Sequence, residues 1–134
     1  MRLKNIKKQS GSLLVEALIA VAIFMIGVLG ILQLSGVVIK QTAESKYRAD
    51  ASFFAQEAAG RLWADKINIA SYTTTSYGPR LDISNRIASV LPNGTLAITL
   101  TPNGTGRTDA QVVVGWRQSG EPVRSVITIT TIAD

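Results

Sequence analysis

The feature that most constrains this chain is a long apolar segment near its N-terminus. Residues 12–39 contain one ionisable side chain, Glu16, and every residue from 17 to 32 is apolar or glycine. A transmembrane helix needs roughly 20 predominantly apolar residues. We therefore expect a membrane-spanning helix over residues 12–39.

Basic side chains precede this segment without any acidic neighbour, and they are Arg2, Lys4, Lys7 and Lys8. Basic residues beside a transmembrane helix favour the cytoplasmic side of the membrane. We expect residues 1–11 to be a cytoplasmic leader and the C-terminus to lie across the membrane. Since acidic and basic residues nearly balance in the rest of the chain, the net charge of +5 belongs to the leader. It does not indicate direct binding to nucleic acid.

Two ordinary interpretations of the apolar segment remain possible. A secretory signal peptide has an apolar region of about 7–15 residues followed by a small-residue cleavage site. Here the apolar run is longer, and no such site follows it. A simple single-pass anchor fits the hydropathy, with Glu16 as a tolerated residue near the interface. A charged side chain costs about 2.5–3.5 kcal/mol at the bilayer centre on insertion scales, so a carboxylate in such a segment usually has a function.

The order of residues around Glu16 favours a function. Gly11 ends the leader, and Ser12 lies four residues before Glu16, so that the two share one face of a helix. Cleavage between Gly11 and Ser12 would give Ser12 a positively charged amine close to a carboxylate. A buried charge pair is weak evidence for stability but a reasonable device for setting register between docked subunits.

The string KKQSGSLLVEALIA at residues 7–20 resembles the class III signal of type IV pilins and pseudopilins. The stretch that follows, with Gly27, Gly30 and Gln33, looks most like the PilV-type minor pilins. The similarity covers about residues 7–36. A departure from the family pattern is the first mature residue, which is usually Phe and is Ser12 here.

The resemblance implies a role for each residue of the signal. A prepilin peptidase would cut between Gly11 and Ser12, Ser12 would be N-methylated, and Glu16 would serve in subunit docking. The glycines of the apolar segment leave two alternatives open, which are close helix–helix approach and local melting of the helix in a filament. The implied location is the bacterial inner membrane, with a cytoplasmic N-terminus and a periplasmic C-terminus, and then the pilus filament.

The apolar helix is expected to continue as an amphipathic helix over residues 40–66. An apolar stripe at helical spacing consists of Ala43, Tyr47, Phe54, Ala58 and Leu62. Favourable i,i+4 charge pairs are Glu44–Arg48 and Glu57–Arg61. The aromatic residues, interpreted as core packing against a globular head, are Tyr47, Phe53, Phe54 and Trp63.

The remainder of the chain predicts a small antiparallel sheet. Alternation and β-branching predict three strands, at residues 95–101, 110–117 and 123–133. In the second strand Val112, Val114 and Trp116 point to one side, which predicts a core beneath the long helix. The tetrapeptide Pro-Asn-Gly-Thr occurs at 92–95 and at 102–105, which predicts two turns that bracket one strand.

The segment before the strands is expected to be less regular. Residues 71–80 are expected to form a loop, because Gly78-Pro79 is a turn signal and no periodicity is visible. Residues 81–90 are expected to form a short helix with Ile83, Ile87 and Val90 on one side.

The sequence offers little for catalysis. It has no Cys and no His, which excludes thiolate nucleophiles, imidazole bases and Cys/His metal sites. Asp82 and Asp109 are isolated carboxylates without a second acid at a defined spacing. We expect no catalytic residue, no cofactor site and no metal site, and hence no enzyme.

Together these features predict an α+β chain with the type IV pilin fold, in which a long N-terminal helix, half membrane anchor and half amphipathic, packs on a small antiparallel sheet. The expected divisions are a cleaved leader, a membrane and filament-core half-helix, an amphipathic half-helix and a periplasmic head, at residues 1–11, 12–39, 40–66 and 67–134.

The expected function is that of a minor pilin in the assembly and initiation of a type IV pilus. Its expected partners are other minor pilins, the major pilin, the prepilin peptidase, the inner-membrane assembly platform and membrane lipid. The alternatives are a type II secretion pseudopilin and a non-cleaved bitopic membrane protein with a periplasmic binding domain.

Overall fold

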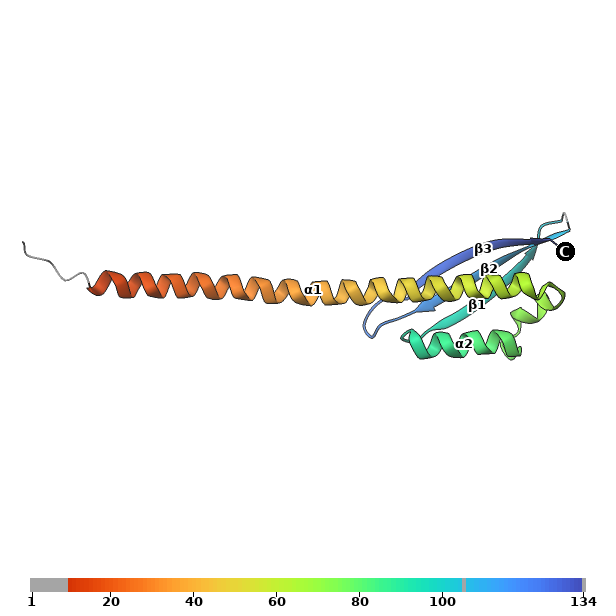
Figure 1. The fold of residues 1–134 in the computed structure, drawn as a ribbon, viewed down its shortest axis with the longest axis horizontal. Helices are drawn as coiled ribbons and strands as arrows, with labels where there is room; N and C mark the ends of the chain where they lie inside the picture. Colours follow the sequence, from red (N-terminus) through yellow and green to blue (C-terminus); the bar gives the residue numbers. More distant parts are fainter. Residues whose placement is uncertain (1–9, 105, 134) are drawn as a thin grey trace, which may run out of the picture. The chain divides into compact units, whose positions relative to one another are not determined.

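A computed structural model describes residues 10–104 and 106–133 (Figure 1). The elements in chain order are helix α1 (Ser10–Ala64), the 3-10 helix η1 (Lys66–Thr73), helix α2 (Gly78–Val90) and strands β1 (Thr95–Pro102), β2 (Arg107–Trp116) and β3 (Arg124–Ala133). The chain divides into two compact units, Met1–Thr42 and Ala43–Asp134, and α1 contributes to both. The basic leader residues Arg2, Lys4, Lys7 and Lys8 lie outside the described residues.

In the first unit, α1 is helical through all three glycines of the apolar segment, Gly27, Gly30 and Gly36. Side chains from Ser12 to Thr42 are exposed. Two hydroxyls bond to the helix backbone: Ser35 Oγ donates to the Ile31 carbonyl at 3.0 Å, and Thr42 Oγ1 donates to the Val38 carbonyl. These two hydroxyls are therefore satisfied within the helix, as polar groups in lipid must be.

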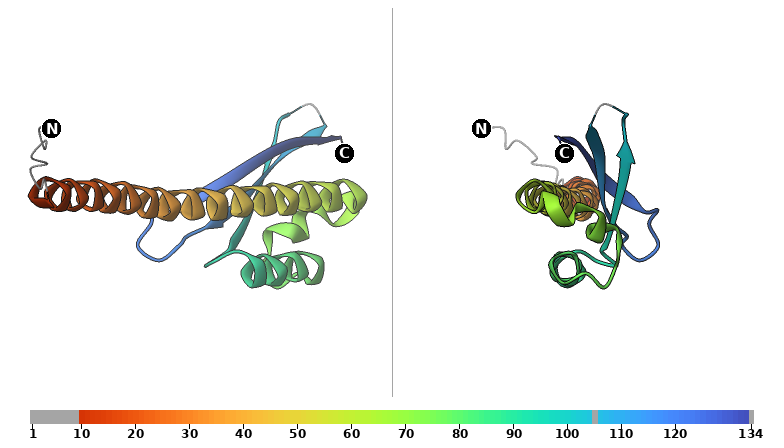
Figure 2. Two further views of the ribbon diagram at one scale, coloured as in Figure 1. Left: turned by 60° about the vertical axis from the view of Figure 1, so that its left-hand side comes forward. Right: turned by 90° about the vertical axis from the view of Figure 1, so that its right-hand side faces the viewer.

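The second unit contains a three-stranded antiparallel sheet with the order β1-β2-β3. In its central row, Ile98 pairs with Val112, and Val112 pairs with Thr128. Figure 2 shows α2 and the C-terminal segment of α1 on the same face of this sheet. The expected α+β fold, a long N-terminal helix with a small antiparallel sheet, is confirmed.

The core of the second unit lies between this sheet face and the two helices. α1 contributes the buried residues Ala51, Phe54, Ala55, Ala58 and Leu62, whose spacing follows the helical period. Ile83 and Ile87 are buried from α2, and Val112, Val114 and Trp116 are buried from β2. The predicted inward alternation of β2 and the predicted stripe of α1 from Phe54 to Leu62 are thus confirmed.

The expectations for two aromatic side chains and for one ion pair are wrong. Phe53 is 59% exposed, and Trp63 is 44% exposed although its Nε1 donates to Thr130 Oγ1 of β3. Glu44 pairs with Arg124 at 3.1 Å, where a pair with Arg48 was expected. The sheet places a cation from a distant strand beside this carboxylate, which local spacing does not reveal.

The expected loop at residues 71–80 is more ordered than the sequence indicates. Its first residues complete η1, and Tyr72 is buried in the core. The Gly78-Pro79 pair begins α2, so the helix starts before residue 81, where it was expected. Proline fits the first turn of a helix, because the N–H that it lacks has no partner within the helix there.

The turns on either side of β1 confirm the interpretation of the repeated tetrapeptide. Asn93 has a positive φ of 50°, and its Nδ2 donates to the Arg117 carbonyl at 3.0 Å. At the other turn, the Asn103 backbone N–H donates to the Arg107 carbonyl, and Gly104 has a φ of 77°. The first turn joins α2 to β1, and the second joins β1 to the antiparallel strand β2.

Candidate functional site

The residues predicted to act in processing and docking lie at the start of α1. Gly11 belongs to the helix, which begins at Ser10. Ser12, Val15, Glu16 and Ile19 line one face of α1. Ser12 and Glu16 therefore share a face, as their spacing predicts, and Glu16 is an exposed carboxylate on an apolar surface. Their roles in cleavage, N-methylation and docking stay predictions.

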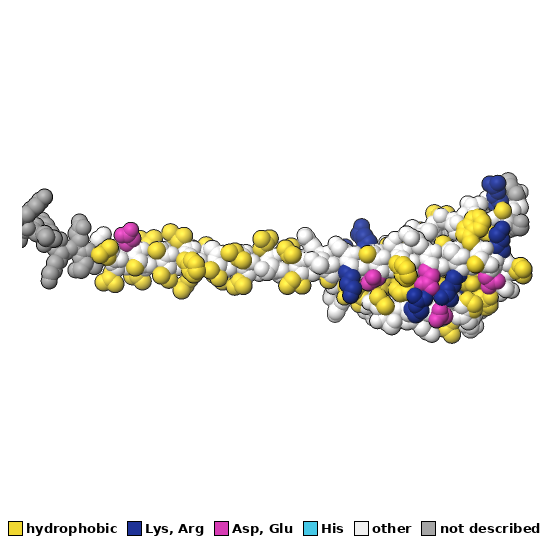
Figure 3. Space-filling view, viewed as in Figure 1, with side chains coloured by type: hydrophobic (Ala, Val, Ile, Leu, Met, Phe, Trp, Pro, Cys, Tyr) yellow, Lys and Arg dark blue, Asp and Glu magenta, His cyan; other side chains and the backbone are white. Residues whose placement is uncertain are grey.

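The surface around Glu16 is apolar on every side of the helix. The consecutive residues Ile23, Phe24, Met25 and Ile26 are 59 to 71% exposed. Since successive residues of an α-helix are about 100° apart, four in a row cover the whole circumference. Figure 3 shows hydrophobic side chains along this half of α1, and charged side chains gathered on the second unit.

A helix that is apolar all round needs an apolar surrounding. Among the residues that the structure describes, α1 is the one helix that is long and apolar enough to cross a membrane, and this criterion rests on length and composition alone. Lipid is a suitable surrounding for the apolar half, and so is a bundle of similar helices.

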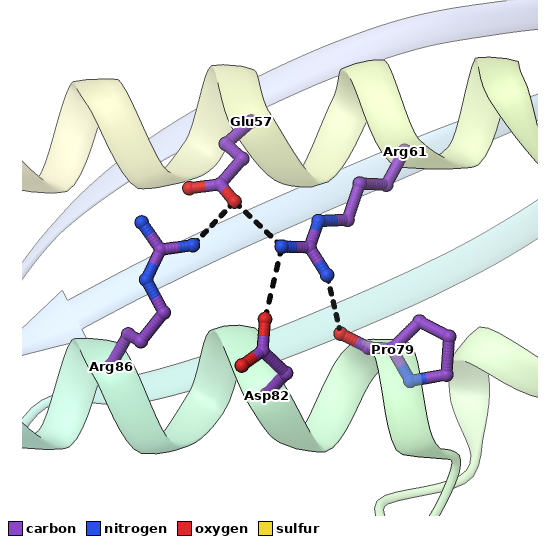
Figure 4. A network of polar contacts seen from close by, with 5 residues as sticks. All are labelled: Glu57, Arg61, Pro79, Asp82 and Arg86. Atoms are coloured by element: carbon purple, nitrogen blue, oxygen red, sulfur yellow. Dashed lines mark hydrogen bonds and ion pairs between the residues drawn. The ribbon is translucent and has the colours of Figure 1, made fainter.

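In the second unit, an ion-pair network joins α1 to α2 (Figure 4). Arg61 Nη2 lies 2.9 Å from Glu57 Oε1 and 3.0 Å from Asp82 Oδ2, and Arg61 Nη1 donates to the Pro79 carbonyl. Arg86 of α2 pairs with the same Glu57 oxygen at 2.5 Å. The predicted Glu57–Arg61 pair is thus present, and two residues of α2 extend it into a four-residue network.

The network changes the ionisation of its members. Burial alone would raise the pKa of the Glu57 carboxyl, but hydrogen bonds and positive charge from Arg86 and Arg61 lower that pKa below its ordinary value of 4.5. For Arg61, burial acts to lower the pKa, and hydrogen bonds to Glu57 and Asp82 outweigh it and raise the pKa. The network therefore favours the charged forms and holds α2 against α1.

A second polar cluster orders the connection between α1 and α2. Asp65 accepts hydrogen bonds from Tyr77 at 2.8 Å, from Asn68 at 2.8 Å and from Tyr72 at 3.4 Å. The hydrogen bonds from Asn68 and Tyr77 lower the pKa of Asp65. Burial, and then the charge of Asp65, raises the pKa of Tyr72. The two tyrosine rings also meet edge to face, so this cluster fixes the path of the chain from η1 into α2.

Sequence reasoning missed Arg80, which is buried to 7% exposure. Its Nη2 donates to the Leu96 carbonyl of β1 at 3.1 Å, and its Nε is buried without a hydrogen-bond partner. The position next to Gly78-Pro79 hid it, because those two residues indicate a turn where arginine is normally exposed. Proline in the first turn of a helix was the signal that would have placed Arg80 on α2.

Metal-binding side chains do not gather in either of these two clusters. Across residues 10–104 and 106–133, no group of three or more His, Cys, Asp or Glu side chains is placed to hold a metal ion. Both clusters join elements of the second unit to one another. The candidate functional site is therefore the Ser12–Glu16 face and the apolar surface around it.

No protein-family model matches this chain, and no curated protein or solved structure matches it either.

Proposed function

We propose that this chain is a minor pilin of a type IV pilus, processed after Gly11 and stored in the bacterial inner membrane until it enters a filament. The observation that carries the proposal is the apolar surface of α1. It surrounds the helix completely, and its one ionisable residue, Glu16, shares a face with Ser12. The α+β fold of the second unit, with its own core, supports the same proposal.

The apolar half of α1 suits both stages of this life cycle. In the membrane, lipid surrounds its exposed side chains, and the leader keeps the N-terminus cytoplasmic. When the subunit leaves the lipid for a filament, burying these side chains against neighbouring helices keeps the same apolar surface away from water. The second unit, called the head from here on, folds around its own core, so it does not depend on the filament to stay folded.

Glu16 gives each docking step a defined register. A carboxylate among apolar helices is costly unless a cation accompanies it. After cleavage, the amine of Ser12 supplies a cation on the neighbouring subunit, and a methylated amine keeps that charge. The prepilin peptidase, the assembly platform, the major pilin and other minor pilins are the partners this role requires.

The test compares two polar positions in the same half of α1. Glu16→Gln removes the charge with little change in size, whereas Ser35→Ala removes a hydroxyl that bonds only to its own helix. We expect loss of surface pili with Glu16→Gln, normal pili with Ser35→Ala, and equal amounts of both proteins in the membrane. Normal piliation with Glu16→Gln would contradict the proposal. Normal piliation together with lost protein secretion would indicate the pseudopilin alternative.

A further inference from the structure

The two edge strands of the sheet, β1 and β3, differ in how far other elements protect them from pairing with a further strand. At the β1 edge, the buried Arg80 of α2 donates to the Leu96 carbonyl. β1 also contacts α2 and η1, and it ends at Pro102, which has no N–H to offer. The β1 edge is thus covered by other elements and capped by a cation, so it has little room for another strand.

The β3 edge has fewer of these protections, and its cation, Lys66, bonds to the carbonyl of Ala133 at the end of the strand. Residues 125–133 include no charged residue and no proline, although lysine, proline and bulges are the usual means of blocking an edge. β3 pairs with β2 without a break from Arg124 to Ala133. Ile127 and Ile129 are 54 and 68% exposed on its outer face. This is a long, regular and apolar edge, which favours pairing with another chain.

The register shows which backbone groups face outward. Because the Arg107 carbonyl accepts from the Asn103 N–H, the backbone groups of alternate residues from Arg107 onward in β2 point toward β1. The pair of Leu96 with Val114 is then of the non-hydrogen-bonded type. Alternation then makes the next pair across the sheet, Val114 with Val126, hydrogen-bonded. The N–H and C=O groups of Ile127, Ile129 and Thr131 therefore point to the open edge.

Charge at one end of this edge defines its partner further. Lys66 Nζ donates to the Ala133 carbonyl at 3.2 Å and lies 5.4 Å from the centre of the Trp63 ring. Arg107, an exposed residue, is the register partner of Ala133. Two cations thus stand where β3 ends, beside an uncharged strand. The complementary partner is an uncharged extended segment with a carboxylate at this end.

We propose that the open edge of β3 is a strand-addition site for an extended segment of another protein. The segment pairs antiparallel to β3, has alternating β-branched residues and carries an acidic residue near its N-terminus, opposite Ala133. Its backbone groups bond to Ile127, Ile129 and Thr131. Its inward side chains cover the exposed part of Trp63, whose Nε1 donates to Thr130 Oγ1 in the neighbouring layer.

A second copy of this chain fits the site less well. For a second copy to continue the sheet, its β1 would have to pair with the open edge of β3. That β1 edge is capped by Arg80 and covered by α2. The sheet can therefore receive one strand at β3 without passing the interaction to a further copy, which distinguishes this site from the helix contacts of the proposed function.

The experiment uses the full chain in detergent micelles and a blocked synthetic peptide, acetyl-Glu-Thr-Val-Thr-Val-Thr-Val-Thr-amide. Amide hydrogen exchange is followed residue by residue, together with tryptophan fluorescence. At peptide concentrations roughly tenfold above the dissociation constant, exchange at Ile127, Ile129 and Thr131 should slow by about tenfold. The emission of Trp63 should shift to shorter wavelength. A peptide with Lys in place of Glu should bind more weakly.

Three variants make the test specific. Ile129→Pro removes an outward N–H and no bond to β2, so it should abolish the protection. Ile129→Lys is a second way to block the edge, and Thr99→Lys is its matched control, since both residues flank Gln111 in one row of the sheet. Thr99→Lys should bind the peptide normally.

Several results would overturn the proposal. These are exchange unchanged by the peptide, equal protection in the Ile129→Pro variant, and protection on β1 in place of β3. The same three amides could also become protected without peptide as the concentration of the chain is raised. That result would assign the edge to a second copy and would reject the proposed occupant. Each readout is independent of piliation, so the outcome does not depend on the proposed function.

Discussion

The two halves of α1 have the same backbone conformation and opposite surfaces. Residues 12–39 are apolar around the full circumference, and their side chains are exposed. Residues 43–64 place one stripe in the core of the head and carry charged residues elsewhere. Helix formation is common to both, so it does not distinguish them. The width of the apolar surface distinguishes the two halves. A helix with one apolar stripe packs that stripe against one partner face, whereas a helix that is apolar all round needs an apolar surrounding on every side.

The sharpest test of this comparison is the same substitution in each half. Leu62 is fully buried and Leu32 is 62% exposed. Leu62→Ala should lower the free energy of unfolding of the head by about 2–5 kcal/mol, because it removes buried methyl groups and leaves a cavity. Leu32→Ala should change it by less than about 0.5 kcal/mol. Denaturant unfolding of the full chain in micelles measures both, and equal effects would break the comparison.

The two halves also use their carboxylates differently. Glu57→Gln should destabilise the head by about 1–2 kcal/mol, between the values for exposed and buried ion pairs, because its side chain and its arginine partners are partly exposed. Glu16→Gln should leave this free energy unchanged, since Glu16 lies in the other unit. If both variants unfold like the parent chain, the ion-pair network does not hold α2 in place.

The pH dependence of the head should follow from Glu57 and Asp65, whose pKa values are both lowered on folding. The unfolded chain then binds more protons than the folded one as pH falls, so the free energy of unfolding decreases. This free energy should stay constant from neutral pH down to slightly above 4.5, the ordinary pKa of a glutamate carboxyl, and should decrease at lower pH. Urea unfolding at a series of pH values measures it. In Glu57→Gln the fall should be shallower, and an unchanged profile would exclude Glu57 as a source.

A small stabilisation should appear at a glycine in the amphipathic half. Gly60 is helical, and a Cβ there would meet no atom within 4 Å. Gly60→Ala should raise the free energy of unfolding by about 0.4–1 kcal/mol, because alanine loses less backbone freedom on folding. Gly30→Ala, equally free of contacts, is the matched change in the apolar half and should leave the head unaffected. Thermal unfolding of both variants checks this.

Local patterns predicted most of the fold. The span of α1, the three strands and the inward alternation of β2 all follow from the period of apolar residues, which acts over a few neighbours. The helix start at Pro79 was missed because Gly-Pro indicates a turn and also fits a first helical turn. The exposure of Phe53 and Trp63 was missed because aromatic residues suggest a core more strongly than their angular position on the helix allows.

The candidate sites also contain a part that local spacing predicts and a part that depends on tertiary packing. Ser12 and Glu16 could be placed on one face from spacing alone, because their geometry is local to one helix. In the α1–α2 network, only the Glu57–Arg61 pair was predictable, since Asp82 and Arg86 reach it through tertiary packing. Glu44 pairs with Arg124, which is eighty residues away, and Arg80 caps a strand edge. Contacts of this kind depend on the sheet register, which one sequence does not reveal.

The measurement that tests the central claim most directly is the intact mass of the protein purified from membranes of cells with and without the prepilin peptidase. If the chain is a processed filament subunit, the mass in peptidase-containing cells should match a chain that begins at Ser12, with or without one added methyl group. In cells without the peptidase, the full chain from Met1 should be found. A mass that retains Met1 to Gly11 in both cells would contradict this account and would favour an uncleaved membrane-anchored protein.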